Sequence, residues 1–338
     1  MNRNNPTGRG QALFVWPLQF AADCRWALLL VLFLLILAQP LHAAGVCSIG
    51  ISQYACSTLA PVGATSTRAS GVNNSGQVTG FYELLGMHAF SYSGSSFSQL
   101  PDPSGASAVY AFGINESGQI VGYTLGSGGE KGFIRTGSTY TTLSAPGASS
   151  TYAFGINAAG QVAGFWSSTS GSTGYVYSGG TFTAVAMPGA ASTYVYGINN
   201  SGMLAGTYVS PAGAVAGFAS QNGTFTSVSV PGAQQTYVRG LNGIGDLVGE
   251  YVNSLGTHGF VRLGSGEFWT FDIAGAARTY AASINDARAV VGYFGSEAYQ
   301  GFFAMPTPVP LPAALPLLSA GLMMLGWYSR RGPVARIS

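Results

Sequence analysis

Apolar and polar positions alternate over short runs along most of the chain, and these runs recur with a nearly constant period. Six segments share the pattern of GINESGQIVGY at 113–123, in which an alternating run reaches an Asn, a turn follows, and a short apolar run returns. Successive Asn residues are 42, 42, 42, 43 and 43 positions apart. They are Asn73, Asn115, Asn157, Asn199, Asn242 and Asn285. A Gly precedes each Asn by ten positions and an aromatic residue follows it by 17–19, so the pattern indicates an internal repeat.

One repeat, 151–190, shows the predicted strands. TYAFGIN at 151–157 alternates, which places Tyr152, Phe154 and Ile156 on one face of a strand. A turn at 157–160 leads to the strand QVAGFW, and TGYVYS and TFTAVAMPGA supply a third and a fourth strand. Four short antiparallel strands in about 40–45 residues are typical of a β-propeller blade. A β-solenoid and a string of small sandwiches are the alternatives, but solenoid coils are usually shorter and a sandwich needs more residues.

The two ends of the repeat region complement each other. The last repeat has three predicted strands between 278 and 304, whereas residues 54–73 match the fourth-strand stretch of another repeat at 141–157. We therefore expect a strand near 55–60 to complete the last blade, which removes exposed sheet edges. The predicted fold is all-β, a six-bladed β-propeller of four-stranded repeats with a split terminal blade.

The Asn segment itself is interpreted as a hairpin turn. The positions between the Asn and the following apolar run vary among the copies, although a ligand loop would need them constant. Asn tolerates left-handed backbone and bonds to its own turn, so the six Asn residues are predicted to be structural turn residues. Calcium binding is the alternative, but the copy with Ala158 and Ala159 offers no side-chain oxygen there. Function is therefore expected in the loops that do not repeat.

Charged residues are scarce along the whole chain. Only 7% of residues are charged, against about 25% in an average soluble domain. Between Gly45 and Pro308 there are seven Lys or Arg and ten Asp or Glu, so no basic stripe for a nucleic acid is present. No nucleic-acid partner and no cofactor are expected.

The first 44 residues have the order of a secretory signal peptide. Arg3, Arg9 and Arg25 precede the 13-residue apolar run at 26–38, and small residues follow near Ala43 and Ala44. An uncleaved anchor is the alternative, although the run is short for a span of about 20 residues.

Two cysteines remain after the signal peptide, Cys47 and Cys56. In an oxidising compartment we expect a disulfide between them, worth roughly 2–3 kcal/mol. A lipidated Cys47 is the alternative, but Ala44-Gly45-Val46 makes a poor lipidation signal.

Residues 305–338 differ abruptly from the repeats. Val309, Pro310, Leu311, Pro312 and Ala313 precede about 16 largely apolar residues, and Arg330 and Arg331 follow them. This order predicts a transmembrane helix with its basic end in the cytoplasm. The tail resembles the PEP-CTERM sorting signal in its VPLPA variant. That resemblance implies processing by an exosortase in bacteria that export exopolysaccharide, after transient anchoring in the inner membrane.

The repeats, over about residues 60–304, resemble the HAF extracellular repeat, with MHAFSYSG at 87–94 carrying the full triplet. This resemblance implies a secreted repeat protein of bacterial surfaces, and it brings no catalytic residues.

Candidate chemistry in the repeats is sparse. His88 and His258 share one repeat position, which is expected to be a surface or rim position without an acidic neighbour, so no metal site is predicted. Asp246 and Glu250 are a possible carboxylate pair, but an exposed rim is favoured. No G-x-S-x-G elbow occurs. Trp166 and Trp269 could stack on sugars, although packing between strands is favoured.

The sequence therefore predicts a non-catalytic binding or scaffolding protein, which is exported and then exposed at the cell surface or released. Its domains are a signal peptide (1–44), the repeat propeller (45–304) and the sorting segment (305–338), and exopolysaccharide or another glycan is its expected partner. A polysaccharide-active hydrolase or lyase and a purely structural surface protein are the alternatives. The low density of titratable residues disfavours the enzyme.

Overall fold

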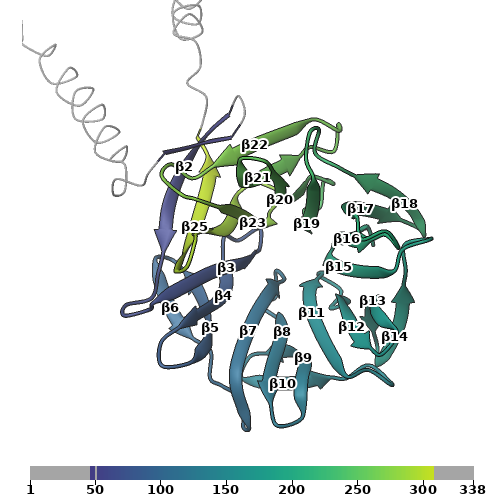
Figure 1. The fold of residues 1–338 in the computed structure, drawn as a ribbon. Coiled ribbons are helices and arrows are strands. Elements are labelled where there is room, and N and C mark those ends of the chain that lie inside the picture. Colours follow the sequence, from purple (N-terminus) through teal and green to yellow (C-terminus); the bar gives the residue numbers. More distant parts are fainter. Residues whose placement is uncertain (1–45, 50–51, 308–338) are drawn as a thin grey trace, which may run out of the picture. The chain divides into compact units, whose positions relative to one another are not determined.

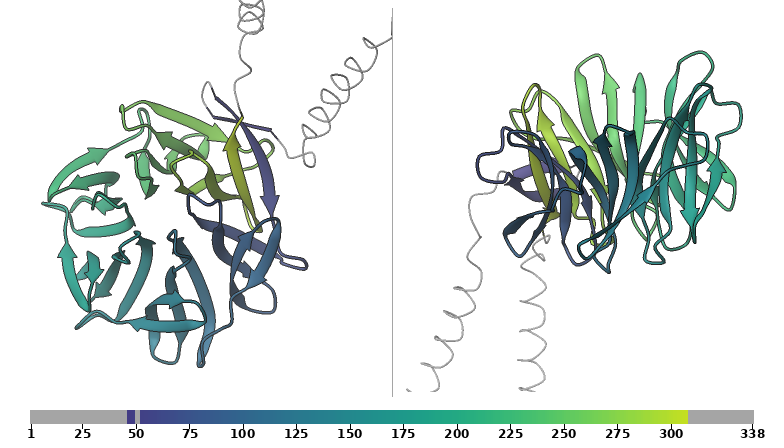
Figure 2. Two further views of the ribbon diagram at one scale, coloured as in Figure 1. Left: turned by 180° about the vertical axis from the view of Figure 1, so that it is seen from behind. Right: turned by 90° about the horizontal axis from the view of Figure 1, so that it is seen from below.

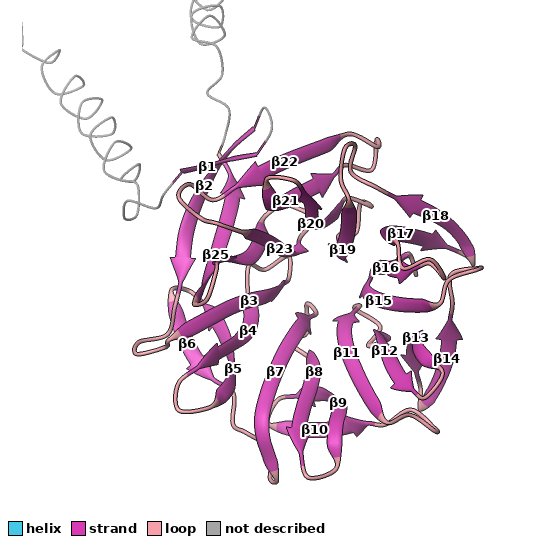
Figure 3. Cartoon of the chain, viewed as in Figure 1, coloured by secondary structure: helices cyan, strands magenta, loops and turns pink. Residues whose placement is uncertain are grey.

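The structure is a computed structural model that describes residues 46–49 and 52–307. The predicted signal peptide and the predicted sorting motif, transmembrane helix and basic tail lie outside these residues. The described part contains only strands, turns and loops (Figure 3). Within it, no helix has the length and apolar character needed to cross a membrane. The described residues are all-β and have a β-propeller arrangement (Figure 1).

Each of the first five repeats folds as four antiparallel strands connected in sequence order. Two repeats form separate sheets. One sheet contains β11 (Ser150–Ile156), β12 (Val162–Ser168), β13 (Gly171–Ser178) and β14 (Thr181–Val185). The next contains β15 (Ser192–Ile198), β16 (Leu204–Val209), β17 (Val215–Gln221) and β18 (Thr224–Val228).

The first two repeats share an eight-stranded sheet because one parallel pair, Met87 with Ala108, joins them. The first contains β3 (Ser66–Val72), β4 (Val78–Glu83), β5 (Met87–Ser93) and β6 (Ser96–Gln99). The second contains β7 (Ala106–Ile114), β8 (Ile120–Gly126), β9 (Gly129–Thr136) and β10 (Thr139–Leu143).

The last two repeats form a nine-stranded sheet together with the start of the described chain. The fifth repeat contains β19 (Gln235–Leu241), β20 (Leu247–Asn253), β21 (Gly256–Arg262) and β22 (Phe268–Asp272). The sixth contributes β23 (Thr279–Ile284), β24 (Val290–Gly295) and β25 (Tyr299–Pro306). β1 (Val46–Ile49) and β2 (Ser52–Leu59) complete the sheet.

β2 supplies the fourth strand of the sixth repeat. It pairs antiparallel with β25 from Tyr54 opposite Pro306 to Leu59 opposite Gly301. β1 lies between β2 and β22 and so joins the fifth and sixth repeats. The purple strand β2 beside the yellow-green strand β25 shows this pairing (Figure 1). Residues from the two ends of the described chain therefore share one sheet.

The core between the strands is built from one repeated contact. The aromatic residue of the third strand is at most 2% exposed in every repeat. These residues are Phe90, Phe133, Tyr175, Phe218, Phe260 and Phe302. Each ring lies over the Gly of the second strand, and a Cβ added at Gly122 would lie 2.9 Å from the Phe133 ring. Gly is required at this position because any side chain would displace the buried ring.

The repeated Asn closes its own turn and also reaches the next repeat. The Asn157 Oδ1 accepts the Gln161 amide at 3.0 Å, and the Asn157 Nδ2 donates to the Gln161 Oε1 at 2.8 Å. The same Nδ2 group donates to the main-chain carbonyl of Asn199 at 3.3 Å. Because Asn157 is 4% exposed, these groups have little access to water.

The contact from one Asn to the next forms a closed ring. In five successive repeats the Asn side chain donates to the carbonyl of the following Asn, at 3.0–3.3 Å. In the sixth repeat the Asn285 Nδ2 donates at 3.0 Å to the carbonyl of Asn73, which belongs to the first repeat. Hydrogen bonds therefore connect all six repeats around one axis, around which the strands are arranged in the left view of Figure 2.

A β-bulge lies in the innermost strand of every repeat. In β11 the pairing register shifts between Ala153 and Gly155, so Phe154 is unpaired in the register. The extra residue changes which side chains share a face. Ile156 consequently packs in the same buried cluster as Ala153. The simple alternation that places Ile156 with Tyr152 and Phe154 is therefore wrong.

We predict that Asn157 is needed as a donor and not only as a turn residue. Asn157→Ala leaves the Asn199 carbonyl and the Gln161 amide without their partner, so the free energy of unfolding should fall by roughly 2 kcal/mol. Asn157→Asp keeps an acceptor for the turn but loses the donor, and it should destabilise by a similar amount. Denaturant unfolding measures both changes.

Ala158→Ser is the matched control, since Ala158 is exposed in the same turn, and it should shift stability by less than about 0.5 kcal/mol. Wild-type stability in the Asn157→Asp variant would show that donation to the next repeat contributes nothing.

Candidate functional site

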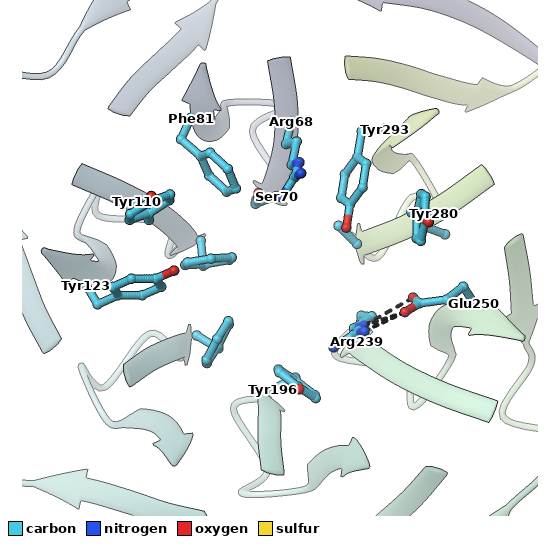
Figure 4. Close-up of a pocket in the computed structure, with 14 residues that line it drawn as sticks. Arg68, Ser70, Phe81, Tyr110, Tyr123, Tyr196, Arg239, Glu250, Tyr280 and Tyr293 are labelled. Atoms are coloured by element: carbon cyan, nitrogen blue, oxygen red, sulfur yellow. Dashed lines mark hydrogen bonds and ion pairs between the residues drawn. The ribbon is translucent and has the colours of Figure 1, made fainter. Parts of the chain in front are cut away.

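Three cavities follow one another along the innermost strands. Arg68 and Ser70 of β3 line the first cavity, and Ser70 and Val72 line the second. Val72 and the six repeated Asn residues line the third. The first, which we call the axial pocket, has a volume of about 200 Å³ and lies at the end away from the Asn turns. Its lining residues come from the first two strands of the repeats (Figure 4).

The bulges supply the residues that surround the axis. The register shift nearest the Asn turn leaves one residue unpaired in each repeat, and all six of these residues line the axial pocket. They are Ser70, Phe112, Phe154, Tyr196, Arg239 and Ala282. A bulge re-aims a side chain locally, which explains why this single position contributes a residue from every repeat.

Aromatic rings form one continuous wall of the pocket. The Phe112 centroid lies 4.5 Å from that of Phe154, and Phe154 lies 4.9 Å from Tyr196. Tyr110 stacks on Tyr123 at 4.7 Å, with 21° between the ring planes. The wall therefore presents apolar ring faces and edges, with phenol groups at intervals.

A buried ion pair lies at the far end of this wall. The Arg239 Nε donates to both Glu250 carboxylate oxygens, at 2.9 and 3.1 Å, and Glu250 is only 3% exposed. The Arg239 guanidinium also lies 4.7 Å from the Tyr196 centroid. Burial alone would lower the pKa of Arg239, but the Glu250 carboxylate outweighs it and holds that pKa well above its usual value.

Arg68 is the other cation of the pocket. Its guanidinium carbon lies 4.4 Å from the Tyr299 ring centroid and 5.2 Å from that of Tyr293, on the opposite wall from Arg239 (Figure 4). Among residues 46–49 and 52–307, no carboxylate forms an ion pair with Arg68. Aromatic faces hold this cation in place instead.

Tyr123 and Tyr293 are two of the four phenols in the pocket whose pKa burial raises, the others being Tyr196 and Tyr280. Burial raises the pKa of Tyr123, and burial together with the Glu250 carboxylate raises the pKa of Tyr293. Both groups are therefore neutral at physiological pH. In that state they donate and accept hydrogen bonds and are poor bases.

Asp246 and Glu250 do not form a carboxylate pair on an exposed rim. Asp246 is 1% exposed, lies in the Asn turn, and accepts hydrogen bonds from Arg288 Nε at 2.8 Å and the Gly264 amide at 2.9 Å. Glu250 instead faces the axial pocket and binds Arg239. The prediction of an exposed rim is wrong because each carboxylate has a cation from an adjacent strand or repeat that makes its burial possible.

The two histidines have acidic partners, contrary to the expectation. His88 Nδ1 lies 2.9 Å from Asp102 Oδ2, and His258 Nδ1 lies 2.9 Å from Asp272 Oδ2. Each Asp follows its His by 14 positions. Each pair connects the third strand of its repeat to the end of the fourth strand or to the loop directly after it. The described residues contain no group of three or more His, Cys, Asp or Glu that could hold a metal ion.

Both tryptophans pack against neighbouring side chains. Trp166 stacks on Tyr175, with centroids 5.8 Å apart and 18° between the planes. Trp269 packs against a buried cluster and donates to Glu267 Oε1 at 2.9 Å. Neither residue lines the axial pocket.

The remaining predicted residues are only partly described. Cys56 is disulfide-bonded, and its pairing with Cys47 stays a prediction because the Cys47 side chain lies outside the described part. Val309, Pro310, Leu311, Pro312, Ala313, Arg330 and Arg331 all lie beyond the described residues.

Sequence reasoning looked for function in the loops that do not repeat, whereas the axial pocket is formed by strand residues. Arg68 takes a position that is Tyr in the five other repeats, and Arg239 takes a position that holds no other cation. Listing the repeats in register reveals both departures. What the register could not reveal is that these positions face the axis, since that depends on the bulge.

The chain matches no protein-family model and no curated protein. Three similar solved structures are virginiamycin B lyase of Staphylococcus aureus, the lectin of Aleuria aurantia and TolB of Acinetobacter baumannii. Their identities are 11%, 14% and 11%, and their TM-scores are 0.46, 0.46 and 0.48. The matches cover 75%, 74% and 73% of this chain and 100%, 100% and 65% of those chains. At these scores the likenesses carry no argument about function.

We predict that Asp246 and Arg288 stabilise the fold as a pair. Arg288 has a φ of 61° at the turn position where the other repeats have Gly. Arg288→Gly relieves that strain but leaves Asp246 buried without its cation, so the unfolding free energy should fall by roughly 1–2 kcal/mol. Adding Asp246→Gln restores the Gln and Gly of other repeats and should recover the loss.

Denaturant unfolding of the single and double variants tests this coupling. Glu297→Gln, at an exposed carboxylate, is the control and should leave stability unchanged. Equal stability of the Arg288→Gly single variant and the double variant would contradict the coupling.

Proposed function

We propose that this chain is an exported bacterial surface protein whose repeats form a six-bladed β-propeller that binds a glycan without catalysis. The observation that carries the proposal is the axial pocket, with its continuous aromatic wall, its neutral phenols and its few charged groups. Small-molecule sites combine mostly apolar walls with a small number of placed polar groups. The proposed ligand belongs to the cell envelope or the exopolysaccharide matrix.

The chemistry of a sugar ring suits this pocket. One face of a pyranose carries mostly C–H groups, which pack on aromatic ring faces, while its hydroxyl groups need donors and acceptors. Phe112 and Phe154 offer such ring faces, and Tyr123 offers a phenol. Drug-sized ligands occupy pockets of about 300–1,000 Å³, so a cavity of about 200 Å³ suits a single ring.

The charges in the pocket favour binding over acid–base catalysis. A catalytic acid or base needs a titratable group free to exchange a proton near neutral pH. Glu250 is the one carboxylate among the described pocket residues, and Arg239 holds both of its oxygens. The raised pKa values of Tyr123 and Tyr293 also move them away from neutral pH.

Glycan binding by the full chain tests the proposal, with a panel that includes neutral and acidic oligosaccharides. Phe154→Leu keeps an apolar side chain but removes the flat ring, and it should weaken binding roughly fivefold, in line with the extra energy of aromatic contacts. Trp166→Phe is the control outside the pocket and should bind like the wild type. Absence of binding to the whole panel contradicts the proposal, and loss of polymer viscosity on incubation favours the enzyme.

Export and processing have a separate test. We propose that an exosortase recognises Val309–Ala313. Arg330 and Arg331 hold the apolar segment that precedes them in the inner membrane, with its basic end in the cytoplasm. Replacing both Arg residues with Glu should leave unprocessed chain, visible as a larger species in the membrane fraction. Unchanged processing of this variant in a host with the enzyme would contradict that role for the Arg pair.

A further inference from the structure

The axial pocket is not symmetric, and the side chains at its bulge position are smallest in the two repeats next to Arg68. At the bulge position, the second, third and fourth repeats carry the large residues Phe112, Phe154 and Tyr196. The sixth and first repeats, which are neighbours in the ring, carry Ala282 and Ser70 at the same position. Small side chains therefore leave room on the side of the pocket from which Arg68 comes.

Arg68 differs from Arg239, the other cation of the pocket, in having no carboxylate partner. Arg239 binds Glu250, and Arg288 binds Asp246. No such pair to Arg68 exists within the part of the chain that the structure describes. The aromatic rings around Arg68 attract its positive charge but do not neutralise it. The guanidinium therefore has no negatively charged partner among these rings.

The pocket therefore has a net positive charge. Arg68 and Arg239 contribute two positive charges, and Glu250 contributes the one negative charge among its lining residues. A planar guanidinium in a half-buried site matches a carboxylate through two parallel hydrogen bonds. The paired Arg239 and Glu250, on the opposite wall, remain able to bond to hydroxyl groups.

We propose that the axial pocket binds an acidic sugar, a uronic acid residue of a polysaccharide, and that Arg68 pairs with its carboxylate. This inference rests on the proposed glycan binding and specifies the class of glycan. The sugar ring lies against the aromatic wall, and its carboxylate occupies the space that Ser70 and Ala282 leave beside Arg68. A neutral sugar packs against the same aromatic wall but brings no negative charge to pair with Arg68.

Calorimetric titration of the full chain with tri-galacturonate and with its carboxyl-reduced counterpart tests the inference. The wild type should bind the acidic trisaccharide at least about tenfold more tightly, as expected for charge-assisted hydrogen bonds. Arg68→Met removes the charge at similar length, so it should remove this preference and bring the ratio of the two affinities close to one. Arg68→Lys should recover part of the preference, and Arg262→Met, outside the pocket, should match the wild type.

The outcomes separate the two levels of the proposal. Equal affinity for both trisaccharides, unaffected by Arg68→Met, overturns the acidic-sugar inference and leaves glycan binding standing. Binding of 4-hydroxybenzoate without binding of tri-galacturonate shows that the pocket takes an aromatic acid and overturns the sugar class. Absence of binding to the acidic trisaccharide and to every glycan of the panel, by protein whose circular dichroism shows folded β-structure, overturns both.

Discussion

The Asn side chains hold the six repeats together through a closed circuit of hydrogen bonds. Each repeat is a short antiparallel sheet that cannot bury both of its faces alone, so it must be held against its neighbours. One buried amide per repeat satisfies the local turn through its oxygen and the next repeat through its nitrogen. Because the sixth donates to the first, repeats 212 residues apart are held together as neighbours.

The pocket is a consequence of this closure. Six innermost strands converge on one axis, and the bulge in each strand turns one residue toward it. Gly follows the bulged residue in five repeats, and a Cβ there would meet the neighbouring inner strand, as at Gly155, where it would lie 3.0 Å from the Gly197 Cα. The bulge and its Gly thus recur along the chain, whereas the side chain that each bulge turns toward the axis differs from repeat to repeat.

The two buried carboxylates of the repeat region lie at positions where the repeats differ from one another. Glu250 replaces an apolar or hydroxyl-bearing side chain of other repeats, and it is buried only because Arg239 lies on the adjacent strand of the same repeat. Asp246 and Arg288 form the second such pair, across consecutive repeats. Burying either carboxylate alone would cost several kcal/mol. A repeat that introduces a buried carboxylate therefore also needs an Arg on an adjacent strand or in the next repeat. Arg68 departs from the Tyr of the other repeats in the axial pocket and has no such partner among the described residues.

Local alternation and comparison of the copies are enough to predict the period, the all-β class, the turn at each Asn and the pairing between the two ends of the repeat region. They do not reveal that the Asn amides join different repeats or that Arg68, Arg239 and Glu250 share one cavity, which follows from the folded arrangement of the strands. One extra residue in a strand changes which side chains face the axis, and contacts between residues 42 positions apart leave no mark on either local pattern.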